Sequence, residues 1–264
     1  MSQLEKLKSI LTEIGKAVVT LSGGVDSSYL ASIAKETLGN NVRAITVSSP
    51  LLPDYEKREA QKLAEYLQMP HEFIEMDELT DANFSSNPND KCYICKTMRL
   101  QKISSWAEER NIPWILDGSN IDDLSDFRPG MKALKEFSNV RSPFLEAGIN
   151  KEEIRAQSKL SGLFTWNKPA AACLASRISP EQPITRINLK QVEEAEEYLY
   201  TILPREIQLR VRHHVQTARI EIDRDHMEEL IAGSDRIVNH FKKIGFRHIT
   251  LDLAGYSKGS LNDR

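Results

Sequence analysis

The most constraining feature of this sequence is the alternation of short apolar segments with longer amphipathic ones, from the N-terminus to about residue 120. It comprises helix-like segments at residues 1–14, 25–38, 53–68 and 95–110 and strand-like segments at residues 17–21, 42–47, 71–76 and 113–116. Strands that alternate with helices of this length pair in parallel through right-handed crossovers. The pattern therefore predicts an α/β fold with an open parallel sheet that helices cover on both faces.

After about residue 120 the pattern changes, because residues 122–142 are rich in turn formers and charges, and the sheet is expected to end. Asn150 is placed to cap a helix over 151–160. The later segments predict a helix at 188–202, strands at 207–212, 218–222 and 248–251, and helical structure over 225–244. We expect a first domain at 1–160, a linker at 161–187 and a smaller α+β domain at 188–264.

Composition excludes several classes of protein. The chain has 264 residues, and its 35 Lys and Arg against 38 Asp and Glu give a net charge of -3, so a nucleic-acid partner is not expected. No segment approaches the roughly 18 consecutive apolar residues that a membrane span needs, and the N-terminus lacks the apolar core of a signal peptide. We therefore expect a cytoplasmic protein without a membrane partner.

A glycine-rich loop, Ser22-Gly23-Gly24-Val25-Asp26-Ser27, lies between the first predicted strand and its helix. Backbone N–H groups and the helix dipole favour an anion at such a position, and ligands of open α/β sheets bind at the carboxyl ends of strands. The loop is neither a Walker loop nor a dinucleotide fingerprint. One alternative is a tight turn in which Ser22 caps the helix.

A second segment, residues 116–123 (LDGSNIDD), begins at the end of the fourth predicted strand. Because the carboxyl ends of parallel strands meet at one edge of a sheet, this segment and the glycine-rich loop are expected to lie together. The alternative is a solvated acidic loop.

The three cysteines are Cys92 and Cys95, a CxxC pair at the start of a predicted helix, and the distant Cys173. So small a number of cysteines argues against a disulfide framework. A structural zinc normally requires four Cys or His ligands and is therefore disfavoured. A redox pair would leave Cys173 without a role, and buried, inert cysteines are a further alternative. Three thiolates match a [4Fe-4S] cluster held at three of its irons.

Several segments together resemble the LarE family of ATP-dependent sulfur transferases, which have the PP-loop fold of the N-type ATP pyrophosphatases. They are SGGVDS, NPNDKCYICK, LDGSNIDD, the RPG at 128–130, WNKPAAACLASRI and ITLDLAGYSKGSLND, so the resemblance covers essentially the whole chain. It implies that ATP adenylates a carboxylate of pyridinium-3,5-biscarboxylic acid mononucleotide, a precursor of the nickel-pincer cofactor, which then becomes a thiocarboxylate. AMP and pyrophosphate are the other products.

The resemblance also assigns residues to the ATP site. Asp26 would help to place Mg²⁺, an ion that takes one or two carboxylates and completes its shell with phosphate oxygens and water. Gly118 would approach the nucleotide, and the backbone of Ile45 and Val47 would meet the adenine edge. The phosphates would be held by Ser22, Gly23, Gly24 and Ser27.

Two sulfur routes are known in this family. Members with three cysteines carry a [4Fe-4S] cluster that can relay sulfide, and members with one, at the position of Cys173, give up its sulfur. Here we expect the cluster on Cys92, Cys95 and Cys173, with sulfide or another sulfur donor as a partner, and sacrifice of Cys173 as the rival route. The resemblance further implies a homo-oligomer, with a hexamer as the candidate assembly.

Arginines are the natural partners of an anionic mononucleotide, because the guanidinium matches carboxylates and phosphates bidentately. The candidates are Arg177, Arg210 and Arg212, of which the last two match a phosphate-contacting pair in LarE proteins; the alternative is a salt-bridged strand. Further candidates are a secondary metal site on Glu196, Glu221 and Glu229, and shielding of the cluster by Tyr93 and Trp166, which core packing explains equally well.

Three other functions remain open from the sequence. A PP-loop enzyme with three cysteines could thiolate tRNA, although the near-neutral charge opposes this. An ammonia-dependent ligase of the same fold would leave the cysteines unexplained. A carrier protein could bind nucleotide or cluster without consuming ATP.

Overall fold

The computed structural model describes residues 2–124, 130–170, 172–180 and 182–257, and it divides the chain into two compact units. The N-terminal unit comprises Met1–Ser49, Asp54–Met76 and Asp90–Lys168, and the C-terminal unit comprises Pro50–Pro53, Asp77–Asn89 and Pro169–Arg264. These units are discontinuous, whereas the sequence pattern predicted contiguous segments divided at 160 and 187. Parts of three motifs, residues 128–129, 171 and 258–263, lie outside the described residues.

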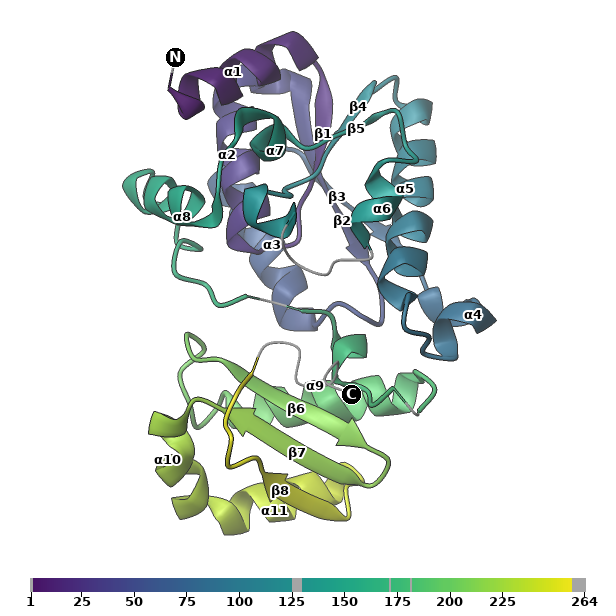
Figure 1. The fold of residues 1–264 in the computed structure, drawn as a ribbon, viewed down its shortest axis with the longest axis vertical. Helices are drawn as coiled ribbons and strands as arrows, with labels where there is room; N and C mark the ends of the chain where they lie inside the picture. Colours follow the sequence, from purple (N-terminus) through teal and green to yellow (C-terminus); the bar gives the residue numbers. More distant parts are fainter. Residues whose placement is uncertain (1, 125–129, 171, 181, 258–264) are drawn as a thin grey trace. The chain divides into compact units, whose positions relative to one another are not determined.

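The N-terminal unit is built on a five-stranded parallel sheet in the order β3-β2-β1-β4-β5 (Figure 1). Its strands are β1 (Ala17–Thr20), β2 (Val42–Ser48), β3 (His71–Glu75), β4 (Trp114–Leu116) and β5 (Val140–Arg141). The predicted open parallel sheet is therefore confirmed. Because the chain continues from β1 to β2 on one side and later places β4 on the other, the carboxyl end of β1 is a topological switch point.

The expectation that the sheet ends after β4 is wrong. Residues 140–141 form a fifth strand, whose Val140 and Arg141 lie opposite Ile115 and Leu116 of β4 in parallel register. A strand of two half-buried residues has no period-two pattern, so nothing in the sequence distinguished it from the surrounding loop.

Helices cover both faces of this sheet (Figure 1). Side chains of α1 (Gln3–Ile14), α2 (Val25–Leu38), α3 (Asp54–Tyr66), α7 (Pro143–Ala147) and α8 (Lys151–Leu160) form one core with β1. On the other face, α5 (Lys91–Glu109) packs on the sheet and α6 (Gly130–Leu134) packs against α5. Neighbouring residues of β1 divide between the two cores, Val19 in the first and Val18 in the second, as the pleat of a doubly covered strand requires.

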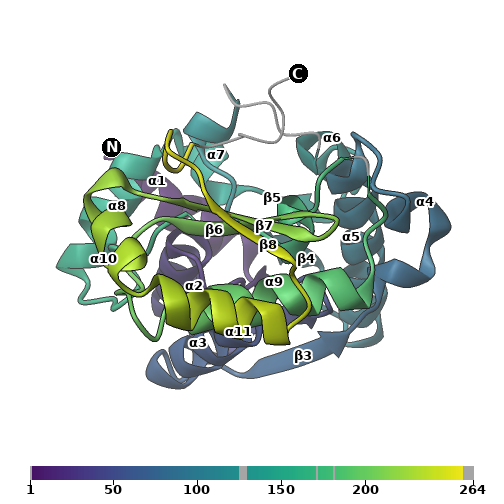
Figure 2. The ribbon, with the colours of Figure 1, turned by 90° about the horizontal axis from the view of Figure 1, so that it is seen from below.

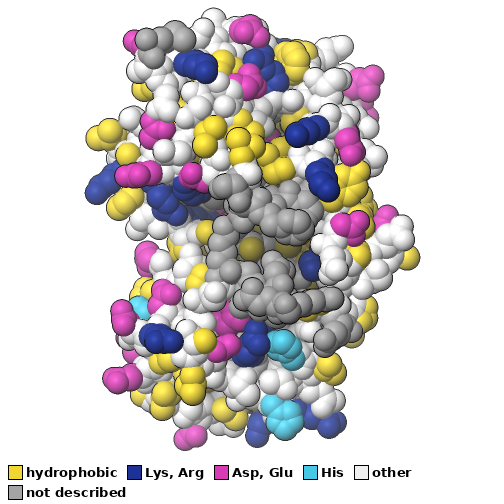
Figure 3. Space-filling view, viewed as in Figure 1, with side chains coloured by type: hydrophobic (Ala, Val, Ile, Leu, Met, Phe, Trp, Pro, Cys, Tyr) yellow, Lys and Arg dark blue, Asp and Glu magenta, His cyan; other side chains and the backbone are white. Residues whose placement is uncertain are grey.

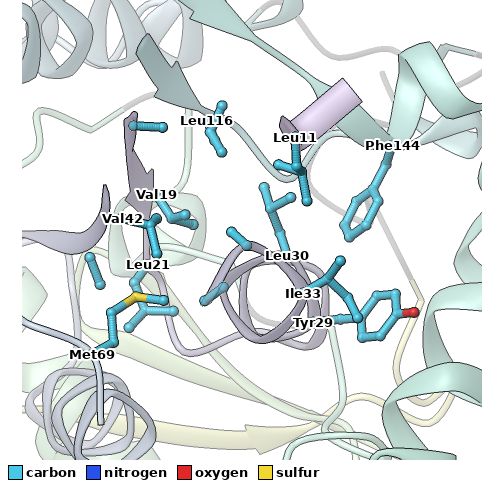
Figure 4. Packing of buried hydrophobic residues seen from close by; sticks show 14 of the residues in the cluster. Leu11, Val19, Leu21, Tyr29, Leu30, Ile33, Val42, Met69, Leu116 and Phe144 are labelled. Atoms are coloured by element: carbon cyan, nitrogen blue, oxygen red, sulfur yellow. The ribbon is translucent and has the colours of Figure 1, made fainter. Parts of the chain in front are cut away.

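The first core surrounds α2 (Figure 4). In that view Leu30 of α2 points toward Leu11 of α1, and the rings of Tyr29 and Phe144 stack with centroids 5.8 Å apart. Burial raises the pKa of Tyr29 to about 12, with smaller contributions from Glu36 and Glu153. This packing fixes α2, and hence the position of its N-terminus, against the sheet.

Sequence signals placed most helix ends correctly. Gly15 and Gly39 follow α1 and α2 with φ of +71° and +60°, positive values that glycine adopts without strain. Asn150 caps α8 in a capping box with Glu153. In contrast, α5 begins at Lys91 rather than at residue 95, so that both cysteines of the CxxC pair lie inside it.

The C-terminal unit is a small α+β structure. Its sheet has the order β6-β7-β8, with β6 (Leu209–His214) antiparallel to β7 (Thr217–Ile222) and β8 (His248–Leu251) parallel to β7. Two helices, α9 (Arg186–Leu199) and α11 (Ser234–Lys243), lie on one face of this sheet, and α10 (Met227–Ala232) precedes α11 (Figures 1 and 2).

Two early segments of the chain belong to this C-terminal unit. The Leu174 N–H donates to the Leu51 carbonyl at 2.9 Å, and the Ile184 N–H donates to the carbonyl of Ser85, at the end of α4 (Ala82–Ser85), at 2.8 Å. Throughout residues 2–124, 130–170, 172–180 and 182–257, each helix is too short or too polar to cross a lipid bilayer.

Candidate functional site

The loop of residues 22–27 leaves the carboxyl end of β1 and begins α2. Gly23 has φ +74°, and a Cβ there would also lie 3.3 Å from the Glu56 carbonyl oxygen of α3. The N-cap residue of α2 is Gly24, and no side chain caps the helix. The alternative in which Ser22 caps the helix is therefore wrong, and the first N–H groups of α2 are left for another acceptor, as in anion-binding helix termini.

Two serine hydroxyls lie beside these N–H groups. Ser22 Oγ and Ser27 Oγ are 3.1 Å apart, and the Gly24 N–H points toward Ser22 Oγ at 3.4 Å. Ser27 Oγ also donates to the Gly24 carbonyl at 3.1 Å, and the Ser22 N–H donates to Ser27 Oγ at 3.2 Å. The loop is thus held by its own polar groups, with two hydroxyls at its centre.

The 116–123 segment meets this loop. A Cβ on Gly118 would lie 3.2 Å from the Ser27 backbone nitrogen and 3.4 Å from the Asp26 carbonyl carbon, so only glycine fits without movement. The adjacency of β1 and β4 brings the two segments together, as the strand ends predicted. The roles assigned to Gly118 and to the loop residues in binding a nucleotide stay predictions.

Asp26 has two polar partners. Asn120 Nδ2 donates to Asp26 Oδ1 at 3.4 Å, and Lys151 Nζ donates to Asp26 Oδ2. A partly exposed carboxylate beside a phosphate-type loop fits Mg²⁺, which needs only one or two protein carboxylates when phosphate oxygens and water complete its shell. Sequence analysis missed Lys151, since a lysine at the first position of a helix carries no pattern.

An ion pair between a half-buried lysine and a buried aspartate, also missed from the sequence, lies next to Gly118. Lys96 Nζ is 2.5 Å from Asp117 Oδ2, and Ser119 donates to Asp117 Oδ1 from its backbone N–H at 2.9 Å and from its hydroxyl. Burial raises the pKa of Asp117, but Lys96 and the Ser119 hydrogen bonds outweigh it and hold that pKa below its usual range. Lys96 lies one helical turn after Cys92, which is the sequence signal that could have found it.

Both residues predicted to meet the adenine edge lie in β2. The Ile45 carbonyl accepts from the Leu21 N–H at 2.8 Å, so it is used by the end of the β1 ladder. Backbone polar groups alternate in direction along a strand, so those of Val47 point to the same side of β2 as those of Ile45, which is the side of β1. Thr20, the last residue of β1, lies opposite Ile45, so Val47 lies beyond the end of β1. Of the two residues, Val47 is the better placed to meet a ligand.

Basic side chains lie close to the glycine-rich loop. Figure 3 shows Lys and Arg side chains over α8 and the segment that follows it. Those that contact the site are Lys151 on Asp26 and Lys168, whose Nζ is 3.0 Å from the Gly23 carbonyl oxygen. Each of these ammonium groups is paired with a carboxylate, Lys151 with Asp26 and Lys168 with Glu56, so the uncapped N–H groups of α2 are the feature that favours an anionic ligand.

The cysteines are divided between the two units. Cys92 and Cys95 lie three residues apart in α5, on one face of the helix, and Cys92 is exposed while Cys95 is half-buried. Cys173 is half-buried in the C-terminal unit, where it precedes a single 3-10 turn, Leu174–Arg177. Among the described side chains, no three His, Cys, Asp or Glu groups converge on a point that could hold a metal ion. The cluster ligand set stays a prediction.

Arg177 binds the backbone around Cys173. Its guanidinium donates to Glu196 through Nε at 3.0 Å and Nη2 at 3.1 Å, and Nη1 donates to the Cys173 carbonyl at 3.0 Å. Burial lowers the pKa of Arg177, but Glu196 outweighs it and raises that pKa; Arg177 in turn holds the pKa of Glu196 below its usual range. This buried pair fixes the chain at Cys173, and direct contact of Arg177 with a substrate stays a prediction.

The two arginines of β6 differ in their partners. Arg212 donates to Glu221 Oε2 through Nε at 2.9 Å and Nη2 at 2.7 Å. Arg210 instead donates to the carbonyls of Leu209 and Ala170, and in the described chain no carboxylate lies within 4.0 Å of it. Burial, and then the charge of Arg177, lower the pKa of Arg210, and the charge of Glu196 opposes them only in part. A buried cation that forms no close ion pair is suited to bind an anion.

The secondary metal site is not formed by the described side chains. Glu196 binds Arg177, Glu221 binds Arg212 and Arg219, and Glu229 is exposed on α10, where it lies 3.6 Å from His226. Tyr93 donates its hydroxyl to Glu136 at 2.8 Å, and the Trp166 ring faces the Lys159 ammonium at 4.5 Å from its centroid. Their predicted role around a cluster stays a prediction.

Comparison with known proteins places the chain in a family. The NAD synthase family profile matches residues 4–102. An uncharacterized protein of Synechocystis sp. is 38% identical over 99% of this chain and 97% of its own length, and the pyridinium-3,5-bisthiocarboxylic acid mononucleotide synthase of Lactiplantibacillus plantarum is 34% identical over 97% and 92%. A GMP synthase of Aeropyrum pernix is 26% identical over 73% of this chain and 41% of its own length.

The two more similar relatives match from end to end, whereas the GMP synthase shares only part of its length. Together with the parallel sheet and the glycine-rich loop at its switch point, this similarity shows that the chain belongs to the LarE family, the family of pyridinium-3,5-bisthiocarboxylic acid mononucleotide synthase.

Proposed function

We propose that this protein is an ATP-dependent sulfur transferase that converts a carboxylate of pyridinium-3,5-biscarboxylic acid mononucleotide into a thiocarboxylate. The observation that carries the proposal is the 34% identity, over 97% of the chain, to a protein whose name states the product of that reaction. The uncapped N-terminus of α2 at the switch point of the sheet supports nucleotide use.

The first step activates the carboxylate. Its oxygen attacks the α-phosphorus of ATP, the bond from that phosphorus to the bridging oxygen breaks, and an acyl adenylate and pyrophosphate form. The N–H groups of the glycine-rich loop and the hydroxyls of Ser22 and Ser27 would bind the pyrophosphate oxygens. Asp26 would hold Mg²⁺, which supplies charge neutralisation at the phosphates when bound.

In the second step a sulfur nucleophile attacks the carboxyl carbon and AMP leaves. A [4Fe-4S] cluster on Cys92, Cys95 and Cys173 would, when bound, offer an iron able to carry sulfide. Cys92 is exposed and Cys95 and Cys173 are half-buried, which suits cluster ligands because sulfide must be able to reach the cluster. In the rival route the Cys173 thiolate attacks, and the carbon–sulfur bond of the cysteine then breaks to leave dehydroalanine.

The C-terminal unit would bind the substrate phosphate. Arg210 supports this role because its buried guanidinium donates to backbone carbonyls and forms no ion pair within 4.0 Å in the described chain, although the charge of Glu196 acts on it from further away. Arg177 would act indirectly by holding the Cys173 backbone.

Pyrophosphate release tests the proposed activity. The protein is mixed with ATP, Mg²⁺ and the bis-carboxylate mononucleotide, with sulfide present, and both pyrophosphate and thiocarboxylate are measured. Formation of both supports a sulfur transferase, whereas nucleotide binding without pyrophosphate release would indicate a carrier. Release that requires tRNA instead of the mononucleotide would indicate tRNA thiolation.

Anaerobic purification followed by iron and sulfide analysis separates the two sulfur routes. The cluster route predicts a coloured protein whose visible absorbance is lost in Cys92→Ala, and turnover sustained by added sulfide. The sacrificial route predicts a colourless protein that turns over once and loses the mass of H₂S at Cys173, with Cys92→Ala fully active.

A further inference from the structure

Lys168 connects the glycine-rich loop to α3. Its Nζ donates to the Gly23 carbonyl at 3.0 Å and to Glu56 Oε2 at 2.7 Å, and it lies 4.9 Å from the centroid of the Tyr55 ring. The side chains of Lys168 and Glu56 are only 10% and 11% exposed. A buried ammonium with a carboxylate, a carbonyl and a ring as partners is confined to one position.

The backbone of Lys168 is fixed as well. Its N–H donates to the Thr165 carbonyl at 3.1 Å, and its carbonyl accepts from Arg155 Nη2 at 2.8 Å. Arg155 belongs to α8, which packs against α2, the helix that the glycine-rich loop begins. The ammonium is therefore positioned from both ends relative to the loop.

Holding the Gly23 carbonyl determines where the next N–H points. In a planar trans peptide the C=O of one residue and the N–H of the next point in opposite directions. With the Gly23 carbonyl drawn toward Lys168, the Gly24 N–H points the other way, to the side of the Ser22 and Ser27 hydroxyls. If this peptide turned over, it would present a carbonyl oxygen to a bound anion instead of a donor.

We propose that Lys168 is a positioning residue of the phosphate loop: Glu56 holds its ammonium, and the ammonium keeps the Gly23–Gly24 peptide in the orientation that binds an anion. The inference deepens the proposed function and rests on it, because it takes the loop to bind the pyrophosphate part of ATP. It gives a role to a buried ion pair that lies outside the glycine-rich loop itself.

A rival role for Lys168 makes the opposite prediction. If Lys168 instead leaves Glu56 to contact the phosphates directly, Glu56→Gln would release the ammonium and strengthen binding of pyrophosphate. If Lys168 positions the loop, Glu56→Gln would loosen the ammonium and weaken binding. The sign of the Glu56→Gln effect therefore separates the two roles.

Isothermal titration calorimetry with inorganic pyrophosphate and Mg²⁺ measures this sign in the full chain. Loss of a charge-assisted hydrogen bond costs about 1.5–3 kcal/mol, so Lys168→Met is expected to weaken binding about tenfold to a hundredfold. Glu56→Gln should weaken it in the same direction, and the double variant should cost no more than the larger single change, because both act through one contact. Lys168→Arg should restore part of the affinity.

The matched control is Lys57→Met. Lys57 follows Glu56 on α3 and pairs with Asp54 at 3.0 Å. The Lys57→Met substitution therefore removes a nearby charge without changing the contact to Gly23, and this variant should bind pyrophosphate as tightly as the wild type does. Urea unfolding of each variant identifies any that fail to fold. The double variant leaves no unpaired buried charge, so it keeps the test valid if Lys168→Met alone unfolds.

A second measurement does not depend on the ligand. In ¹⁵N-labelled protein without pyrophosphate, the Gly24 amide resonance should shift in Lys168→Met and Glu56→Gln but not in Lys57→Met. Unchanged Gly24 resonances, or tighter pyrophosphate binding in Glu56→Gln, would overturn the positioning role. Wild-type protein that binds no pyrophosphate would count against the proposed function, and the Gly24 amide would still decide the role of Lys168.

Discussion

Lys151 Nζ donates a hydrogen bond to Asp26 Oδ2, so the first residue of α8 binds the carboxylate at the start of α2. The Lys151 N–H also donates to Asp122 Oδ2 at 2.8 Å, which ties this end of α8 to the segment after β4. Asp26 is the residue proposed to hold Mg²⁺. An ammonium and a magnesium ion would therefore compete for the same carboxylate.

Removing the Lys151 ammonium should strengthen Mg²⁺ binding. Both side chains are about one-third exposed, at 31% and 28%, so solvent screens the pair. A pair of this kind is worth ~0.2–1 kcal/mol, and we expect Lys151→Met to lower the Mg²⁺ concentration for half-maximal pyrophosphate binding by about 1.5- to 5-fold. Titration of Mg²⁺ at fixed pyrophosphate measures this.

Lys159→Met is the matched control for that experiment, because Lys159 lies on the same helix but faces the Trp166 ring. It should leave the Mg²⁺ dependence unchanged. A higher Mg²⁺ requirement in Lys151→Met would mean that Lys151 serves the bound anion rather than competing with the metal.

The buried pair of Arg177 and Glu196 should dominate the stability of the segment that carries Cys173. The two side chains are 4% and 10% exposed, and removal of one partner of such a pair costs about 3–5 kcal/mol because the other charge stays buried without compensation. We expect urea unfolding of Arg177→Met to give a free energy of unfolding that is lower by this amount. The double variant Arg177→Met/Glu196→Gln should recover most of the loss. A double variant that loses the sum of the two single losses would show that the pair is not coupled.

Asp117 should make the protein less stable in acid. Its pKa is lower in the folded chain than its ordinary value of 3.8, so the folded state stabilises the ionised form. That stability is fully present above pH 3.8 and is lost as the pH falls through the lower, folded pKa. Asp117→Asn should remove this part of the acid dependence, which urea midpoints measured from pH 6 downward would reveal as a flatter profile; an unchanged profile would contradict the assignment.

Local signals in the sequence predicted the architecture of the N-terminal unit well. The run 25–38 between Gly24 and Gly39 became α2 with those bounds, because an amphipathic run between glycines leaves few alternatives. Adjacent parallel strands then placed Gly118 against Asp26, since strand ends share an edge. Both inferences needed only periodicity and topology.

The charged partners of the site could not be predicted in this way. Lys151 and Lys168 reach Asp26 and Gly23 from more than 120 residues away, and no pattern in the sequence marks a lysine that points into a site. Arg212 lies two residues after Arg210 on the same face of β6, so the sequence does not distinguish the two. Only the neighbouring strand, which places Glu221 beside Arg212, shows that Arg212 is paired with a carboxylate. Ion pairing is decided by tertiary neighbours, which the sequence does not display.

Gly118 gives a steric test of the site. A Cβ at this position would lie 3.2 Å from the Ser27 nitrogen, so an alanine must push the first turn of α2 and the segment after β4 apart by a few tenths of an ångström. Overpacking of this kind costs about 1–3 kcal/mol, and the displaced groups are the N–H donors of the loop. We therefore expect Gly118→Ala to weaken pyrophosphate binding by more than its loss of folding stability alone explains.

Gly130→Ala is the control, because the nearest atom to its Cβ would be the Cys92 carbonyl oxygen at an ordinary 3.5 Å. Wild-type pyrophosphate affinity in Gly118→Ala would show that the 116–123 segment does not need to contact the loop for the anion to bind.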